Sequence, residues 1–175
     1  MVETKGFGVI GGGVWGETHL MAYAACPRAR LVGVCDINEE LARQRAAQYG
    51  AEMWTTDYRE LLARDDVDAV SIVTPDFLHH EMAVAAAEAG KHILLEKPMA
   101  TSVEEAQSMA DAAEKAGVKL MVDFHNRWNP AFVQIKAAID AGEMGELQMA
   151  SIRLNDTIYV PTGMLSWAAR STVAW

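Results

Sequence analysis

A glycine-rich stretch near the start of the chain has the residue types and spacing of a phosphate-binding turn. Residues 11–16 read Gly-Gly-Gly-Val-Trp-Gly and satisfy G-x-G-x-x-G at Gly11, Gly13 and Gly16. In such turns the first glycine permits the bend, the second admits a pyrophosphate, and the third lets the helix approach the strand. The helix N-terminus then offers N–H groups to the phosphates. We therefore predict that a dinucleotide contacts Gly11, Gly12, Gly13, Val14, Trp15 and Gly16.

An acidic residue at the end of the next apolar segment indicates which dinucleotide is bound. Asp36 lies 20 residues after Gly16, where a carboxylate can accept hydrogen bonds from the adenosine ribose hydroxyls. Its charge would repel a 2′-phosphate, and residues 37–40 contain no Arg or Lys to bind one. This pattern predicts NAD in preference to NADP. The alternative is a solvated acid at a strand end.

A third group, Glu96-Lys97-Pro98, directly follows an apolar segment. That position predicts a place at the carboxyl edge of a parallel sheet, where ligands of such folds bind. Hydride transfer to or from a hydroxyl-bearing carbon also requires a proton to leave or reach the oxygen, and a partly desolvated lysine can transfer it. Lys97 is therefore a candidate catalytic and substrate-binding residue, although a lysine after a strand is more often simply solvated.

The elements that must position these residues alternate between strand and helix patterns. The predicted strands are Phe7–Gly11, Leu31–Asp36, Glu52–Trp54, Ala69–Thr74, His92–Leu95 and Leu120–Phe124. Helix starts are predicted at Asn38, at Asp76 and at the capping box Ser102–Glu105. The fold class is therefore α/β, a doubly wound parallel sheet (Rossmann dinucleotide-binding fold) over residues 1–122, with its strands in the order of that fold.

Residues 123–175 are expected to begin a second, α+β domain that contributes to a mixed sheet. Pro130 opens a predicted helix to about Ala141, a turn follows at 142–145, and Leu147–Tyr159 is predicted to be extended. So short a segment cannot cover both faces of a sheet, so we expect a truncated domain that belongs to a longer enzyme. An exposed strand edge there would need covering, which favours a homo-oligomer.

Composition excludes several other classes of function. Hydrophobic residues make up 51% and charged residues 22%, as in soluble globular proteins. The net charge is −9 without a run of Lys or Arg, which argues against a nucleic-acid partner. No signal-peptide or membrane-span pattern is visible, so we predict no membrane partner. Cys26 and Cys35 suit a reducing, cytoplasmic location, and no metal site is predicted.

Together these stretches resemble the glucose–fructose oxidoreductase / inositol dehydrogenase family, in which a dinucleotide domain is joined to a mixed-sheet substrate domain. The resemblance covers nearly the whole chain. It rests on Gly11–Gly16, Asp36, Asp68–His79, Ala89–Pro98, and Arg127 with Pro130. Within the family's T-P-N-x-x-H pattern, Asp76 stands where Asn is usual, which adds a negative charge near the cofactor.

The resemblance implies an NAD-dependent dehydrogenase or reductase whose substrate is a sugar, a cyclic polyol or a related hydroxyl compound. Lys97 would touch the reacting hydroxyl, and the Lys97–Pro98 bond is expected to be cis. The cofactor would be lined by Thr74, Pro75, Asp76 and His79 and approached at its nicotinamide ribose by Glu96. The substrate would be contacted by His125, Arg127 and Trp128.

One departure from the family pattern limits what the chain can do alone. Members carry an Asp and a His four residues apart in the second domain, and no D-x-x-x-H follows Arg127 here. We expect that acid/base to lie beyond the end of the sequence. Two other classes stay open: a non-catalytic dinucleotide sensor, against which Lys97 argues, and a methyltransferase, which leaves Thr74-Pro75 and Lys97 unexplained.

Overall fold

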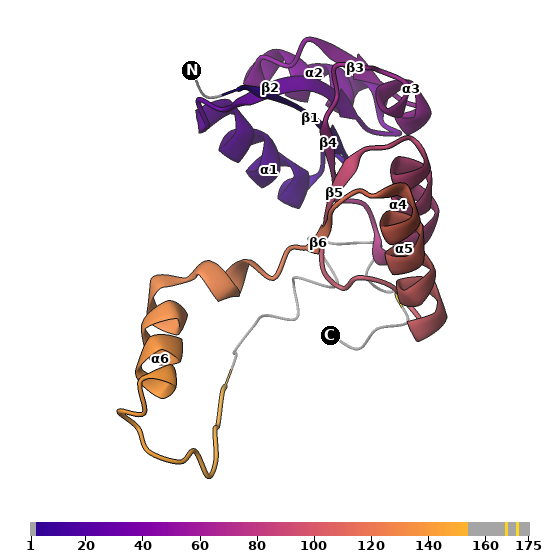
Figure 1. The fold of residues 1–175 in the computed structure, drawn as a ribbon. Helices are drawn as coiled ribbons and strands as arrows, with labels where there is room; N and C mark the ends of the chain where they lie inside the picture. Colours follow the sequence, from indigo (N-terminus) through magenta and orange to yellow (C-terminus); the bar gives the residue numbers. More distant parts are fainter. Residues whose placement is uncertain (1–2, 154–166, 168–170, 172–175) are drawn as a thin grey trace. The chain divides into compact units, whose positions relative to one another are not determined.

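The computed structural model describes residues 3–153, Trp167 and Ser171. The chain forms two compact units, one reaching Asp123 and including Ser171, the other beginning at Phe124. Figure 1 shows the strands and helices of both units. No helix within the described ranges is long and apolar enough to cross a membrane.

The first unit is built on a sheet of six parallel strands. Their bounds are β1 Lys5–Ile10, β2 Ala29–Cys35, β3 Met53–Thr55, β4 Ala69–Ile72, β5 His92–Leu95 and β6 Leu120–Val122. They lie in the order β3-β2-β1-β4-β5-β6, which confirms the predicted doubly wound arrangement. The order reverses between β1 and β4, so the carboxyl ends of these two strands flank the crevice where such folds bind ligands.

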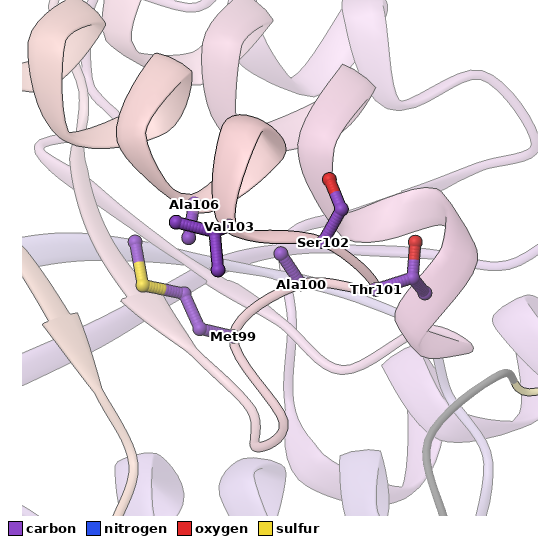
Figure 2. A pocket seen from close by; sticks show the side chains of 6 residues that line it. All are labelled: Met99, Ala100, Thr101, Ser102, Val103 and Ala106. Carbon is purple, nitrogen blue, oxygen red and sulfur yellow. The ribbon is translucent and has the colours of Figure 1, made fainter.

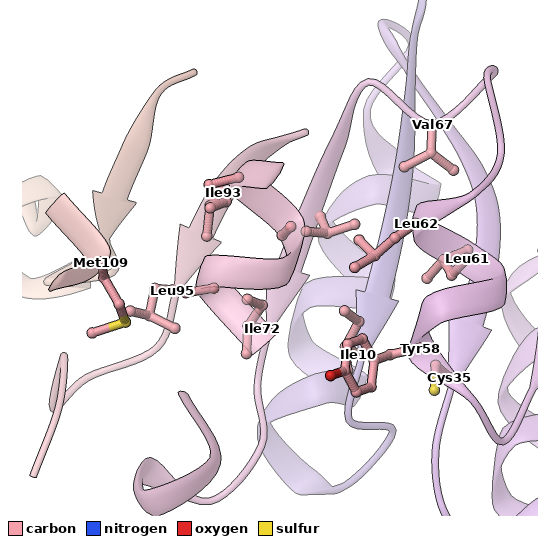
Figure 3. Packing of buried hydrophobic residues seen from close by; sticks show 14 of the residues in the cluster. Ile10, Cys35, Tyr58, Leu61, Leu62, Val67, Ile72, Ile93, Leu95 and Met109 are labelled. Carbon is pink, nitrogen blue, oxygen red and sulfur yellow. The ribbon is translucent and has the colours of Figure 1, made fainter. Parts of the chain in front are cut away.

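Helices cover both faces of this sheet. They are α1 Val14–Ala25, α2 Glu39–Tyr49, α3 Tyr58–Leu62, α4 His79–Glu88 and α5 Val103–Ala116, with a 3₁₀ turn, η1, at Asp76–Leu78. Val9 of β1 packs in one cluster with Leu20 of α1 and Ala46 of α2. Its neighbour Ile10 belongs to the opposite cluster, which includes residues of α3, α4 and α5 (Figure 3). Alternate strand residues therefore serve two cores, as the period of a strand requires.

Side-chain caps mark the start of three of these helices, α2, α3 and α5, and two of them follow sequence patterns. The Asn38 side chain accepts a hydrogen bond from the Leu41 N–H at 3.2 Å, and Ser102 accepts one from the Glu105 N–H at 3.2 Å. Both caps were predicted. The reciprocal half of the capping box is displaced by one residue, because the Glu105 carboxylate accepts from the N–H of Thr101 at 3.1 Å.

The predicted cap at Asp76 was wrong. Pro75 occupies the cap position of η1, α4 follows from His79, and neither start has a side-chain cap. Asp76 is instead the first residue of η1, and its Oδ1 accepts a hydrogen bond from the adjacent Phe77 N–H at 2.9 Å. The fixed φ of proline sets this turn, so the carboxylate is not needed to start it.

The second unit contains a 3₁₀ turn, η2, at His125–Trp128 and the helix α6 at Pro130–Asp140. The Asn129 side chain caps α6 by accepting from the Ala131 N–H at 3.0 Å, and Pro130 stands in the first turn as predicted. Residues 147–153 have no regular secondary structure. The rest of the predicted extended segment lies outside the described residues.

Candidate active site

The glycine turn joins β1 to α1, and its glycines serve different purposes. Gly11 has a φ of +101°, which L side chains rarely adopt, and a Cβ there would lie 2.5 Å from the Val73 carbonyl oxygen. A Cβ on Gly16 would lie 1.8 Å from the Gly11 carbonyl oxygen. A Cβ on Gly13 would meet no atom within 4 Å. Gly11 and Gly16 are therefore required by the fold, whereas Gly13 borders open space that suits a pyrophosphate.

Asp36 lies at the end of β2 and is bonded to this turn. Its Oδ2 accepts from the Gly12 N–H at 2.8 Å, and its Oδ1 accepts from the Asn38 N–H at 2.9 Å. An ionised carboxylate has about four acceptor positions, so each oxygen keeps capacity for a ribose hydroxyl. The structure thus places the Asp36 carboxylate and the glycine turn side by side.

Arg45 of α2 also contacts the turn, a role that no local sequence pattern indicated. Its Nε donates to the Gly12 carbonyl oxygen at 3.2 Å, while its guanidinium forms an ion pair with Glu17 of α1. Because Glu17 also accepts from the Tyr49 hydroxyl at 2.7 Å, this cluster joins α1, α2 and the glycine turn.

Lys97 follows β5 and approaches the glycine turn, which follows β1. The strand order reverses between these two positions, at β1 and β4. Its Nζ lies 5.6 Å from the centre of the Trp15 ring, within the range of a cation–π contact. The Lys97–Pro98 peptide bond is cis, as predicted. The glycine turn and the group Glu96-Lys97-Pro98 are therefore neighbours in space.

Glu96 is buried behind Lys97, with 6% of its surface exposed. Its Oε2 accepts from the Lys97 N–H at 3.0 Å, and its Oε1 lies 3.4 Å from Nε2 of His19. Burial acts to raise the pKa of Glu96, but the contacts with His19 and Lys97 outweigh it and hold that pKa below its usual value. Glu96 is therefore an ionised, fixed carboxylate.

The predicted cofactor residues after β4 are tied to the loop that carries Pro98. Nε2 of His79 lies 2.9 Å from the Thr74 carbonyl oxygen, and its Nδ1 lies 3.0 Å from the Pro98 carbonyl oxygen. The Asp76 carboxylate is contacted by the Ser171 hydroxyl. Asp76 and His79 are each 1% exposed, so their side chains offer almost no surface to a ligand. Thr74 and Pro75 are half-buried, and contact of all four residues with the cofactor stays a prediction.

The predicted substrate residues of the second unit lie on η2. Trp128 is strongly exposed, and the Arg127 guanidinium lies 6.0 Å from the centre of the Phe124 ring. His125 begins the same turn. Their contact with a substrate stays a prediction.

A shallow hollow follows the cis bond and is distinct from the predicted site. It is lined by Met99, Ala100, Thr101, Ser102, Val103 and Ala106. Figure 2 shows the apolar side chains of Met99, Val103 and Ala106 gathered at the start of α5. None of the predicted cofactor or substrate residues lines it, so we assign no dinucleotide contact there.

The buried neighbours of Glu96 were missed by sequence reasoning. His19 and Tyr23 share α1, but Ser71 and Asp123 are far from them in the chain, and each residue looks ordinary within its own element. One signal could have found part of the cluster: Glu96 directly follows the predicted strand His92–Leu95, and Asp123 lies near the end of the predicted strand Leu120–Phe124, so both must lie near the carboxyl edge of the sheet.

A parallel sheet of this order, a glycine turn after β1 and an acid after β2 define a dinucleotide-binding protein of the Rossmann class. Residues 5–124 match the model of the oxidoreductase family with an NAD-binding Rossmann fold. The chain belongs to this family, the glucose–fructose oxidoreductase / inositol dehydrogenase family that its motifs resemble. The family match decides against the methyltransferase alternative.

Relatives with named activities are dehydrogenases. Over 99% of its length the chain is 39% identical to levoglucosan dehydrogenase of Pseudarthrobacter phenanthrenivorans, covering 47% of that protein. Over 79% of its length it is 40% identical to scyllo-inositol 2-dehydrogenase (NAD(+)) of Bacillus subtilis, covering 41% of it. The chain thus spans about half the length of the curated relatives it matches.

A solved structure of the family shows the same fold. A levoglucosan dehydrogenase in complex with NADH and levoglucosan superposes with a TM-score of 0.78 at 39% identity, over 82% of this chain and 41% of that one. NAD is accordingly the cofactor of the family to which the chain belongs.

Proposed function

We propose that the protein containing this chain transfers a hydride between NAD(H) and the hydroxyl-bearing carbon of a sugar or cyclic polyol. This chain supplies the cofactor site and the lysine that acts on the hydroxyl. The observation that carries the proposal is the place of Lys97, whose Nζ lies over Trp15 of the glycine turn. A ligand bound along that turn would have this ammonium group beside it.

The chain's own residues account for binding and for one proton. The glycine turn and the N-terminus of α1 would hold the pyrophosphate, and Asp36 would accept from the adenosine ribose. When bound, the nicotinamide ring supplies the hydride chemistry. Lys97 would hold the substrate oxygen and exchange a proton with it, and Glu96 keeps the Lys97 backbone in place through the 3.0 Å hydrogen bond from its N–H.

The substrate class is supported by the relatives rather than by a pocket in this chain. Several of their names specify levoglucosan, inositols or a D-glucoside, compounds that carry ring hydroxyl groups, and one specifies a semialdehyde. His125, Arg127 and Trp128 would contact such a substrate, since a planar guanidinium and an indole ring suit hydroxyls and sugar faces.

Substitution of Lys97 tests this role in the enzyme that contains the chain. Lys97→Ala should lower kcat by about 10²- to 10⁴-fold, because the substrate oxygen loses its proton-transfer partner, while NADH affinity changes little. Lys97→Arg should stay impaired, since a guanidinium does not release its proton. Steady-state kinetics and NADH fluorescence titration measure both effects.

Lys115, exposed at the end of α5, provides the matched control. Lys115→Ala should leave turnover and NADH binding as they are. Unchanged turnover in Lys97→Ala would remove the proposed role.

A further inference from the structure

A cluster of buried and half-buried polar side chains lies behind Glu96, at the carboxyl edge of the sheet. Its members come from four elements of the first unit or the residues that follow them: His19 and Tyr23 of α1, Ser71 of β4, Glu96 after β5 and Asp123 after β6. We call this cluster the His19 network. His19, Ser71 and Glu96 are almost fully buried, so unpaired polar atoms there would be costly.

The hydrogen bonds of the network have a definite direction when the imidazole is neutral. A carboxylate only accepts, so Nε2 of His19 must carry the proton that faces Oε1 of Glu96 at 3.4 Å and Oδ2 of Asp123 at 3.6 Å. Nδ1 then accepts from the Ser71 hydroxyl at 3.2 Å. Because Ser71 uses its only hydroxyl proton in this bond, the Tyr23 hydroxyl must donate to the Ser71 oxygen, at 2.6 Å.

Protonation of Tyr23 is consistent with this direction. Burial is the main cause that raises the pKa of the Tyr23 phenol; the Ser71 hydrogen bond partly opposes it, and the nearby Asp123 charge adds a smaller rise. Tyr23 is therefore a hydrogen-bond donor at neutral pH. Its ring is itself fixed by stacking on Phe7 of β1, with 4.4 Å between ring centres.

The network ends at the residue that precedes Lys97. Glu96 uses one oxygen for His19 and the other for the Lys97 N–H. If His19 did not hold Oε1, the carboxylate could rotate and the bond to the Lys97 backbone would weaken. The side chain of Lys97 projects from that backbone toward Trp15.

We propose that His19 is a positioning residue that sets the location of Lys97 through Glu96, with Ser71 and Tyr23 fixing the orientation of its ring. The proposal rests on the proposed role of Lys97 in proton transfer. His19 lies on α1, outside the glycine pattern, and would act on the reaction only by positioning Lys97.

Two substitutions separate the bond to Glu96 from the mere presence of a polar side chain. The amide nitrogen of Gln can stand near Nε2 of histidine, where it can donate to Glu96 and Asp123. The shorter Asn reaches only the position of Nδ1, facing Ser71. His19→Gln should therefore keep the function of the network, and His19→Asn should lose it.

Two readouts report on Lys97 rather than on the fold. The first is hydrogen exchange of the Lys97 backbone amide in the chain itself, followed by NMR, which should speed up in His19→Asn and stay slow in His19→Gln. The second is turnover of the enzyme that contains the chain. In His19→Asn, kcat should fall by about tenfold to a hundredfold with little change in KM for NAD, and His19→Gln should recover most of it.

Equal losses in His19→Asn and His19→Gln, or an unchanged Lys97 amide in His19→Asn, would overturn the proposal. If both variants fail to fold, Ser71→Ala tests the same His19 network, because it removes the hydroxyl that fixes the tautomer of the His19 imidazole. Wild-type amide exchange in Ser71→Ala would then count against it. Unchanged turnover in Lys97→Ala would instead contradict the proposed function. The amide-exchange measurement would still decide whether His19 positions Lys97.

Discussion

At the scale of single residues, the glycine turn combines a requirement of the fold with a requirement of the ligand. Gly16 has no room for a Cβ because the Gly11 carbonyl oxygen stands 1.8 Å from where it would lie. Gly13 has that room, and its φ of −64° suits any residue. Alanine at Gly16 therefore tests the requirement of the fold, and alanine at Gly13 tests the requirement of the ligand.

Gly16→Ala should destabilise the fold by about 1–3 kcal/mol or more, since backbone atoms must move to admit the methyl group. Gly13→Ala should leave the melting temperature nearly unchanged yet weaken NADH binding, because its methyl group would enter the space proposed for the pyrophosphate. Thermal melts and fluorescence titrations of the two variants measure the difference. Full NADH affinity in Gly13→Ala would place the phosphates elsewhere.

Some residues of the site can be predicted from a local sequence pattern, and others cannot. Gly11–Gly16, Asp36 and Lys97 follow strands at characteristic spacings, and the structure brings them to one edge of the sheet. His19 meets Ser71 and Glu96 across separations of 52 and 77 residues. Such a meeting depends on the order of the strands, so it becomes visible only when the sheet is assembled.

At the scale of elements, an ion-pair cluster joins β2 to the loop between α3 and β4. Asp66 lies 2.7 Å from Arg64 and 3.2 Å from Arg30 of β2, which in turn lies 2.6 Å from Glu52 before β3. The Arg64 hydrogen bond is the main cause that lowers the pKa of Asp66, with Arg30 assisting against partial burial, to about 2. The side chains of the cluster are more than a third exposed, so solvent screens the ion pairs and their effect on stability is small.

This cluster predicts a pH-dependent difference in stability. A lowered carboxyl pKa stabilises the fold above the unfolded value of about 3.9, and the contribution is lost as the pH falls toward about 2. Asp66→Asn should therefore lower the urea midpoint slightly at pH 7, and the difference from the wild type should shrink as the pH falls from about 4 to about 2. The exposed neighbour Asp65 is the control, and a constant difference across the range would contradict the assignment.

The elements themselves were predictable because their signals are local. All six predicted strands overlap the observed ones. The central strands are largely buried and read as short apolar runs, and the edge strands β3 and β6 are also short and mainly apolar. Asp76 shows where such reasoning fails. Its acid before a hydrophobic pair resembles a helix cap, but Pro75 already sets the turn and the carboxylate is buried.

At the scale of the whole molecule, the first unit is a cofactor-binding module with both faces of its sheet covered. Its place in the oxidoreductase family with an NAD-binding Rossmann fold follows from residues 5–124. The second unit adds η2 and α6, and its exposed side chains supply the proposed substrate contacts. The activity proposed for the whole protein therefore depends first on which dinucleotide the first unit holds.

A titration of the chain with NADH and with NADPH, followed by fluorescence, tests that point most directly. The contact of Asp36 with Gly12 at 2.8 Å predicts that NADH binds more tightly by at least about tenfold, because a 2′-phosphate would face the carboxylate. Asp36→Ala should reduce this preference. NADPH binding as tight as NADH binding, or tighter, would contradict the account.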